Sequence, residues 1–185
     1  MNLLFLFFIF ITGFLTKSGD IIGDKKKDGK RQKFFSYVLG FLYGIFIAYI
    51  IYLLPILSPL AFGVIIAILI TKKIDNSTHV IALASFILFL IYFGFPQTNF
   101  SLILIFLMAA LIDEIGNDLV DKGKLKFKNM KTFLNIFFSY RCTLEITSFF
   151  ISMFLNEWAF FFSLLSFDLG YLSTERVLKK FINIK

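Results

Sequence analysis

Long apolar runs separated by short polar connections make up most of the sequence. The seven longest cover residues 2–18, 34–54, 57–71, 79–95, 99–115, 132–155 and 158–172. The chain is 58% hydrophobic and 17% charged, whereas a soluble domain is about 45–50% apolar and about 25% charged. Such runs are typical of membrane spans, which are helical because hydrocarbon offers the backbone no hydrogen-bond partner. The sequence therefore predicts an all-α, polytopic transmembrane helical bundle of about seven spans, forming one integral membrane domain over residues 1–185.

The positions of the basic residues predict how this bundle is oriented. All 19 lysines and arginines lie at residues 17–33, 72–73, 122–131, 141 and 176–185. The short connections at 55–59, 96–99 and 156–158 contain none. Short basic loops stay in the cytoplasm, so we expect the N-terminus outside, the C-terminus inside and an odd number of spans in the cytoplasmic membrane. No basic region precedes the first apolar run, and we interpret that run as a retained span rather than a signal peptide.

The net charge of +7 is spread between apolar spans instead of covering one face. This distribution argues against nucleic acid as a partner and favours membrane lipids, whose anionic headgroups attract basic loops. A homo-oligomer and a complex with a membrane partner subunit are both compatible with the sequence. One cysteine, Cys142, and one histidine, His79, exclude an internal disulfide, a zinc pattern and a multi-histidine metal site.

Acidic residues follow two of the apolar runs, in "SGDIIGDKKKDGK" (18–30) and "ALIDEIGNDLVDKGK" (110–124). Asp20 and Asp24 are four residues apart and share a helix face, as do Glu114 and Asp118. Carboxylates stacked in this way repel one another unless a divalent ion, the adjacent lysines, or water and counterions neutralise them. If the two helix ends converge, these four carboxylates would suit Mg²⁺, which takes one or two carboxylates and keeps waters or phosphate oxygens. The alternative is a pair of solvated cytoplasmic loops.

A pair of opposite charges lies inside the run 132–155. Arg141 and Glu145 are four residues apart on one face of the expected helix, where a charge near the bilayer centre costs about 2.5–3.5 kcal/mol. Intramembrane ionisable residues are functional candidates, and we assign both as candidate catalytic residues. The alternatives are a structural ion pair, or an interfacial helix over 127–141 that leaves Arg141 at the headgroups.

Five other polar residues are candidates for substrate binding. Asp75 precedes "NSTH", where it and its neighbours can cap the helix that begins near residue 79. His79 could be a ligand, a proton carrier or simply a hydrogen-bonded residue, and Asp168 lies in an apolar stretch with no lysine beside it. The remaining two candidates are Asn117, which precedes Asp118, and Tyr140, which precedes Arg141.

Two further patterns concern helix packing and symmetry. Gly40 and Gly44 in "GFLYG" form a small-xxx-small element that lets a helix approach its neighbour closely. The inward-running spans end with acidic residues, and the segment 19–25 is similar to the segment 117–122. Weak repeats of this kind are typical of transporters and membrane enzymes built from duplicated hairpins.

The segments "GNDLVDKGK" and "GDIIGDKKKDGK" resemble the two Asp-rich motifs of UbiA-type prenyltransferases. In that family such motifs hold Mg²⁺ and a prenyl diphosphate at the cytoplasmic side of a helical bundle. The resemblance implies that one motif is matched in part by Asn117, Asp118 and Asp121, and the other by Asp20, Asp24 and Asp28. The chain departs from the family in having seven expected spans instead of nine, and the first motif lacks its third carboxylate at the expected spacing. We do not assign the chain to that family.

Three functions are compatible with the sequence. The first is a Mg²⁺-dependent membrane enzyme of a lipid-phosphate or prenyl-transfer type, in which Arg141 stabilises negative charge in the transition state. The second is an ion or small-solute transporter or channel that uses the Arg141 and Glu145 pair with Asp168. The third is a non-catalytic membrane subunit. Most carboxylates lie at the expected cytoplasmic interface, where lipid phosphates also lie, and this depth favours the first function.

Overall fold

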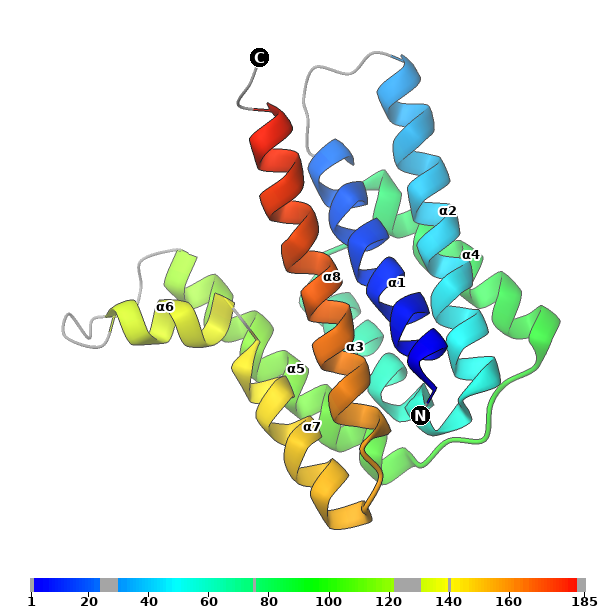
Figure 1. Ribbon diagram of the computed structural model, residues 1–185, viewed down its shortest axis with the longest axis vertical. Coiled ribbons are helices and arrows are strands. Elements are labelled where there is room, and N and C mark those ends of the chain that lie inside the picture. Colours follow the sequence, from blue (N-terminus) through cyan, green and yellow to red (C-terminus); the bar gives the residue numbers. More distant parts are fainter. Residues whose placement is uncertain (1, 24–29, 75, 122–130, 140, 183–185) are drawn as a thin grey trace. The chain divides into compact units, whose positions relative to one another are not determined.

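The computed structural model describes residues 2–23, 30–74, 76–121, 131–139 and 141–182, and within these ranges the chain contains helices and no strand (Figure 1). In chain order the elements are α1 (Leu3–Gly23), α2 (Lys30–Leu53), the short 3₁₀-helix η1 (Pro55–Leu57), α3 (Ser58–Ile70), α4 (Ser77–Phe93), α5 (Phe100–Asp121), α6 (Lys131–Ser139), α7 (Cys142–Leu155) and α8 (Ala159–Ile182). The all-α prediction is confirmed for the described part of the chain.

Three helices are long and apolar enough to cross a membrane, and they are Leu3–Gly23, Lys30–Leu53 and Phe100–Val120. Four shorter apolar helices accompany them, and they cover Pro55–Ile70, Ser77–Phe93, Cys142–Leu155 and Ala159–Thr174. Large apolar side chains are widely exposed, with Phe154 86%, Ile91 67% and Leu104 61% accessible. Soluble monomers seldom expose apolar surface on this scale, so the fold is that of a membrane-associated protein.

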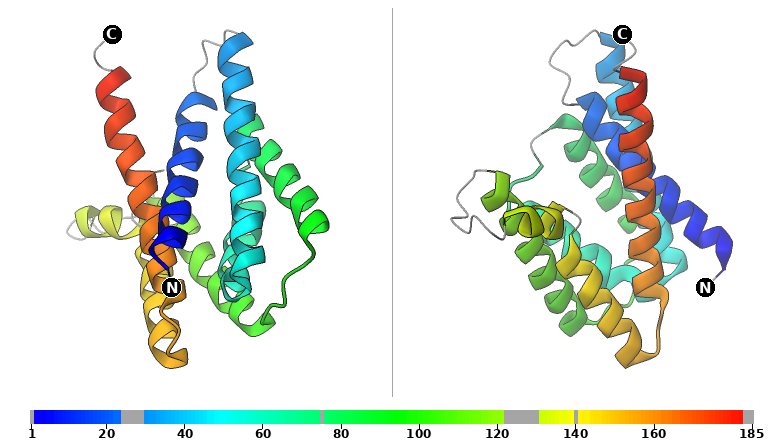
Figure 2. Two further views of the ribbon diagram at one scale, coloured as in Figure 1. Left: turned by 45° about the vertical axis from the view of Figure 1, so that its right-hand side comes forward. Right: turned by 60° about the vertical axis from the view of Figure 1, so that its left-hand side comes forward.

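The run 132–155, predicted as one helix, is divided, and its predicted continuity is wrong. Helix α6 ends at Ser139, and α7 begins at Cys142 after Arg141, whose φ of 51° and ψ of 39° are left-handed. A left-handed residue redirects the chain. Because α7 begins after it as a new helix, the first N–H groups of α7 need partners outside their own helix. In the left view of Figure 2, α6 runs at a steep angle to α7 instead of extending it.

The chain folds as two compact units, each assembled from separate stretches of sequence. Unit 1 comprises Met1–Pro55, Ile74–Gln97 and Phe162–Lys185, and unit 2 comprises Ile56–Lys73 and Thr98–Phe161. Unit 1 therefore contains α1, α2, α4 and most of α8, whereas unit 2 contains α3, α5, α6 and α7. Because neither unit is a continuous segment, this division does not replace the assignment of residues 1–185 to one membrane domain, which stays a prediction.

Glycines set the close packing of unit 1. A Cβ at Gly40 would lie 2.4 Å from the carbonyl oxygen of Thr78, and one at Gly44 would lie 2.3 Å from that of Ala82. The predicted small-xxx-small approach of α2 to a neighbour is thus confirmed, with α4 as that neighbour. A similar crossing joins α1 to α8, where a Cβ at Gly13 would lie 2.1 Å from the Phe167 carbonyl oxygen.

Unit 2 is built around the contact between α3 and α5. Phe106 of α5 is fully buried, and its ring centroid lies 5.3 Å from that of Phe160. Gly63 of α3 packs closely against Phe106, since a Cβ at Gly63 would lie 2.8 Å from the Phe106 Cβ. At the other end of α5, Gly116 leaves room for the ring of Phe138 in α6. These contacts pack α3 and α6 against α5 at two places along its length.

We expect Gly40→Ala to destabilise unit 1, because the added methyl group must push α2 away from the α4 backbone. Overpacking of this kind costs about 1–3 kcal/mol, which a lowered unfolding temperature in detergent micelles would report. Val38→Ile is the matched control, since it also adds one carbon to α2 but at an exposed position. Equal unfolding temperatures for the two variants would contradict the close α2–α4 packing.

Candidate functional site

Several charged side chains of the described residues lie in two networks of ion pairs and hydrogen bonds. The first, here called the ion-pair cluster, belongs to unit 2 and consists of Lys73, Glu114, Asp118 and Arg141. The second, here called the Asp20–His79 network, belongs to unit 1 and consists of Lys17, Asp20, Tyr43, His79 and Tyr171.

The end of α3 places Lys73 in the ion-pair cluster. Lys72 adopts a left-handed φ of 56°. The N–H of Lys72 donates to the Leu69 carbonyl at 3.2 Å, and the N–H of Lys73 donates to the Ile68 carbonyl at 3.1 Å. This pair of bonds is the Schellman motif, with lysine at the position where glycine is commonest. It turns the chain off the α3 axis and sets the Lys73 side chain against α5.

Glu114 is the centre of the cluster. Its side chain is only 9% exposed, with Oε2 2.6 Å from Lys73 Nζ and Oε1 3.2 Å from Arg141 Nη2. Lys73 Nζ also lies 3.1 Å from Oδ1 of Asp118, one helical turn further along α5. One carboxylate therefore binds two cations, one cation bridges two carboxylates, and the four formal charges cancel. Lys73 and Arg141 are the neutralising groups that the stacked carboxylates of α5 require.

The charge of Lys73 is maintained by its neighbours. Burial lowers the pKa of its ammonium group, but hydrogen bonds and charges from Glu114 and Asp118 outweigh burial and raise that pKa above the ordinary lysine value. Because the folded-state pKa is raised, the stabilisation is fully present at neutral pH and is lost only as the pH rises through this elevated value. Lys73 thus stays positively charged throughout the physiological range.

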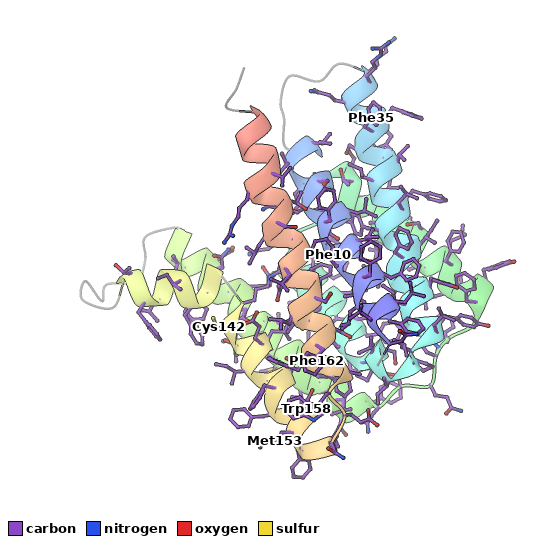
Figure 3. The ribbon with its side chains drawn as sticks, viewed as in Figure 1. Phe10, Phe35, Cys142, Met153, Trp158 and Phe162 are labelled. Atoms are coloured by element: carbon purple, nitrogen blue, oxygen red, sulfur yellow. The ribbon has the colours of Figure 1, made fainter. Side chains whose placement is uncertain are left out.

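Asp113 joins α5 to the beginning of α7. This residue is 1% exposed, and its carboxylate oxygens accept hydrogen bonds from the N–H of Thr143 at 3.1 Å and of Leu144 at 2.7 Å. A carboxylate there satisfies two of the free N–H groups of the helix and is favoured by the helix dipole. Asp113 therefore fixes the first turn of α7, which Cys142 opens (Figure 3), and with it the preceding Arg141.

In unit 1, three helix segments converge on His79. Its Nε2 lies 2.9 Å from Oδ1 of Asp20 at the end of α1, and its Nδ1 lies 2.6 Å from the hydroxyl of Tyr43 in α2. The Asp20 and His79 side chains are 19% and 22% exposed, whereas Tyr43 is 6% exposed. Both imidazole nitrogens are therefore engaged, one with an acid near the surface and one with a buried phenol.

Helix α8 extends this network. The Tyr171 hydroxyl donates to Oδ2 of Asp20 at 3.1 Å and accepts from Lys17 Nζ at 3.2 Å. Lys17 Nζ also lies 4.5 Å from the centre of the Tyr171 ring, a cation–π distance. The result is a continuous polar chain from Lys17 through Tyr171, Asp20 and His79 to Tyr43.

The beginning of α4 is fixed by its own hydrogen bonds. The Asn76 side chain caps α4 by accepting the His79 N–H at 3.1 Å, which is the preferred role of asparagine at this position. Thr78 shares a short hydrogen bond with Ser36 of α2 and is fully buried. The His79 ring is thus carried on a helix end that is held at two neighbouring positions.

The structure brings some of the predicted site residues together. Glu114, Asp118 and Arg141 share the ion-pair cluster, and Asp20 and His79 share the second network. Glu145 lies in the first turn of α7, Asn117 is half-buried in α5, and Asp168 is half-buried in α8. Asp24, Asp75 and Tyr140 lie outside the described residues. The expectation that Asp20 and Asp24 share one metal site with Glu114 and Asp118 stays a prediction, as do the roles given to Glu145, Asn117 and Asp168.

Sequence reasoning missed four members of these networks and the role of Asp113. Lys73 belongs to a basic segment that predicts only the orientation in the membrane. Tyr43 and Tyr171 lie within apolar runs, where a tyrosine gives no sign of a polar partner. The signal for Asp113 was its place inside the apolar face of a helix, where a carboxylate needs a partner. Lys17 carried no signal, because a lysine at a span end is ordinary.

Comparison with known proteins adds no relative. No family model, curated protein or solved structure matches the chain. Among the described residues, no group of three or more histidine, cysteine, aspartate or glutamate side chains is arranged to hold a metal ion. Function is therefore inferred from the side chains of the described residues themselves.

We expect Glu114→Gln to destabilise unit 2, because Lys73 and Arg141 lose the carboxylate that pairs them. The cost should be about 1–3 kcal/mol, below that for fully buried pairs since both cations are part-exposed. Adding Lys73→Met should recover part of this loss, which thermal unfolding of the two single variants and the double variant would measure. Glu157→Gln, at an exposed position beyond the far end of α7, is the control. Strict additivity of the two cluster substitutions would contradict the ion pair.

Proposed function

We propose that the chain is a multi-pass membrane enzyme that binds the phosphate or diphosphate group of a lipid, together with Mg²⁺, at the ion-pair cluster. The observation that carries this proposal is that one cation, Lys73 Nζ, lies within 3.1 Å of both Glu114 and Asp118. Two carboxylates that share one ammonium group are close enough to share a metal ion. Arg141, on the other oxygen of Glu114, supplies a second phosphate-binding group.

The residues of the cluster fit Mg²⁺ chemically. This ion commonly binds through one or two carboxylates and fills its remaining positions with waters and phosphate oxygens, so Glu114 and Asp118 form a sufficient protein ligand set. When bound, Mg²⁺ would neutralise the phosphate oxygens and stabilise a leaving phosphate or diphosphate. Asp20 and Asp24 would be additional ligands only if the two acidic helix ends converge.

The cations of the cluster supply phosphate recognition. Arg141 presents a planar guanidinium group, which suits bidentate binding of phosphate oxygens, and Lys73 presents a compact charge with three donors. Both would be free to bind phosphate if Glu114 and Asp118 held a metal ion instead. Because a cation and an anion would enter together, most of the added charge would be offset within the cluster. Arg141 would then stabilise the charge that develops on the leaving group.

The depth of the cluster supports a lipid substrate. Glu114 and Asp118 lie in the last two turns of the candidate span Phe100–Val120, and the lysine-rich segment 122–131 follows. A helix end that passes into basic sequence lies at the level of the headgroups on the cytoplasmic side. The phosphate of a membrane lipid would therefore meet the cluster without leaving the bilayer.

A direct test is lipid binding by the full-length chain in nanodiscs of neutral lipid. The probes are a C20 isoprenyl diphosphate and phosphatidic acid, each with Mg²⁺ and with EDTA. We expect Mg²⁺-dependent binding of at least one probe, weakened at least about tenfold by Asp118→Asn or Arg141→Gln, as for loss of a charge-assisted contact. Glu157→Gln, the same carboxylate-to-amide change at an exposed site, should bind like the unmodified chain. Binding of neither probe, or binding that both cluster variants leave unchanged, would refute the proposal.

We further propose that all seven apolar segments cross the membrane, with α6 and α7 together serving the sixth crossing. Among the short segments, Pro55–Ile70 spans roughly 25 Å, and local bilayer thinning would accommodate it. In a Cys142→Ser background, an impermeant maleimide added outside intact cells should label Asn99→Cys and Glu157→Cys. It should label Lys126→Cys only after permeabilisation. External labelling at residue 126 would overturn this topology.

A further inference from the structure

Beyond the lipid-phosphate proposal, aromatic rings at the lysine-free ends of the helices carry an inference of their own. We propose that two groups of rings bind the boundary between headgroups and acyl chains in the extracytoplasmic leaflet, and that they fix the depth of the helix ends that bear them. The first, here called the tyrosine group, belongs to unit 1 and consists of Tyr49, Tyr52, Phe89, Tyr92 and Phe93. The second, here called the tryptophan group, belongs to unit 2 and consists of Phe149, Phe150, Trp158 and Phe161.

The tyrosine group lies where α2 and α4 end. These two helices run side by side in the same direction, since Gly40 lies against Thr78 near their beginnings, and the rings of Tyr52 and Phe93 stack at 5.1 Å near their ends. Phe93 is the centre of the group, and its ring centroid lies 5.3 Å from that of Tyr92. The rings therefore form one continuous aromatic surface across the ends of two helices.

The rings that bear hydroxyl groups are the accessible members of the tyrosine group. Tyr49, Tyr52 and Tyr92 are 37%, 47% and 77% exposed, whereas Phe93 between them is half-buried. A tyrosine ring is apolar along its body and polar at its tip, and tyrosine and tryptophan are for that reason enriched where acyl chains meet headgroups. The group thus fits a surface that offers acyl chains on one side and ester and phosphate oxygens on the other.

The tryptophan group joins the end of α7 to the residues that lead into α8. Phe149 is its centre, with its ring centroid 5.7 Å from that of Trp158 and 5.4 Å from that of Phe161. The Phe161 N–H donates to Ser152 Oγ at 3.1 Å, which fixes the same turn through the backbone. Trp158 is 39% exposed. An amphipathic ring is thus held, part-exposed, at the end of a helix.

The charge pattern gives the side of the membrane on which both groups lie. The connections 55–59, 96–99 and 156–158, which adjoin them, contain no lysine or arginine, as expected of extracytoplasmic loops. Within unit 2, the tryptophan group lies at the end of α7 opposite to Arg141 and the ion-pair cluster. The 14 residues of α7 are roughly 21 Å long, so rings bound at the outer interface would hold this helix in a locally thinned bilayer.

Trp158 permits a direct measurement of depth, because it is the one tryptophan in the sequence. The full-length chain is placed in nanodiscs whose phospholipid is brominated either near the ester end of the acyl chain or near its methyl end. We expect ester-end bromines to quench Trp158 fluorescence more strongly than methyl-end bromines, which is a shallow-to-deep quenching ratio above one. Phe41→Trp in a Trp158→Phe background, at an exposed position near the middle of α2, is the control and should give a ratio below one.

A reporter inside the tyrosine group tests the contribution of its hydroxyl groups. In a Trp158→Phe background, Tyr49→Trp should also give a quenching ratio above one. Adding Tyr52→Phe and Tyr92→Phe keeps the rings but removes their polar ends, so the reporter should move deeper and the ratio should fall. Tyr37→Phe, the same change at an exposed position near the beginning of α2, should leave the ratio unaltered.

Three results would overturn the proposal. The first is a Trp158 signal in the unmodified chain that methyl-end bromines quench at least as strongly as ester-end bromines. The second is a ratio at Tyr49→Trp that loss of the two hydroxyl groups leaves unchanged, because rings that pack only on one another would not respond. The third, which concerns the side of the membrane, is absence of external maleimide labelling at Glu157→Cys.

These outcomes are distinguishable from loss of folding and from failure of the proposed function. Near-UV circular dichroism identifies variants that have lost their fold, and the quenching of Trp158 in the unmodified chain needs no variant. Because neither a lipid-phosphate probe nor Mg²⁺ is used, the depth measurement is independent of the binding test on the ion-pair cluster.

Discussion

The junction between the end of α5 and the beginning of α7 is the interaction on which the rest of unit 2 depends. Two adjacent carboxylates of α5 make different contacts there. Asp113 binds backbone N–H groups of α7, and Glu114 binds the side chain of Arg141. In a low-dielectric environment an unsatisfied N–H group or an unpaired guanidinium is costly. The left-handed backbone at Arg141 is compatible with this junction because α5 supplies partners both for the N–H groups of α7 and for the Arg141 guanidinium. Lys73 then ties the end of α3 to the same place.

Hydropathy and charge were sufficient to locate the helices. The predicted runs 34–54, 79–95 and 99–115 correspond to α2, α4 and α5, because burial in lipid and positive-inside charge act locally along the chain. The close helix approach at Gly40 and Gly44 could also be predicted from the sequence, since small residues at this spacing share one helix face. The break at residue 141 could not be predicted, because it depends on Asp113, about thirty positions earlier in the chain.

The partners of the site residues could not be predicted for the same physical reason. Glu114 and Asp118 were recognisable as stacked carboxylates, but their cations come from the end of another helix and from the beginning of a third. Asp20 and His79 were each identified as candidates, yet their sequence separation exceeds that of any local pattern. The bond from Tyr171 to Asp20 joins residues 151 positions apart. Helical spacing predicts which groups share a face, and only the fold decides which faces meet.

The two networks differ in their composition and charge balance. The ion-pair cluster holds two cations and two carboxylates, and the raised pKa of Lys73 keeps that balance through neutral pH. Under the proposed function, a metal ion and an anion would together displace these internal pairs. In the Asp20–His79 network, the formal charges of Lys17 and Asp20 cancel, and His79 contacts both Asp20 and Tyr43.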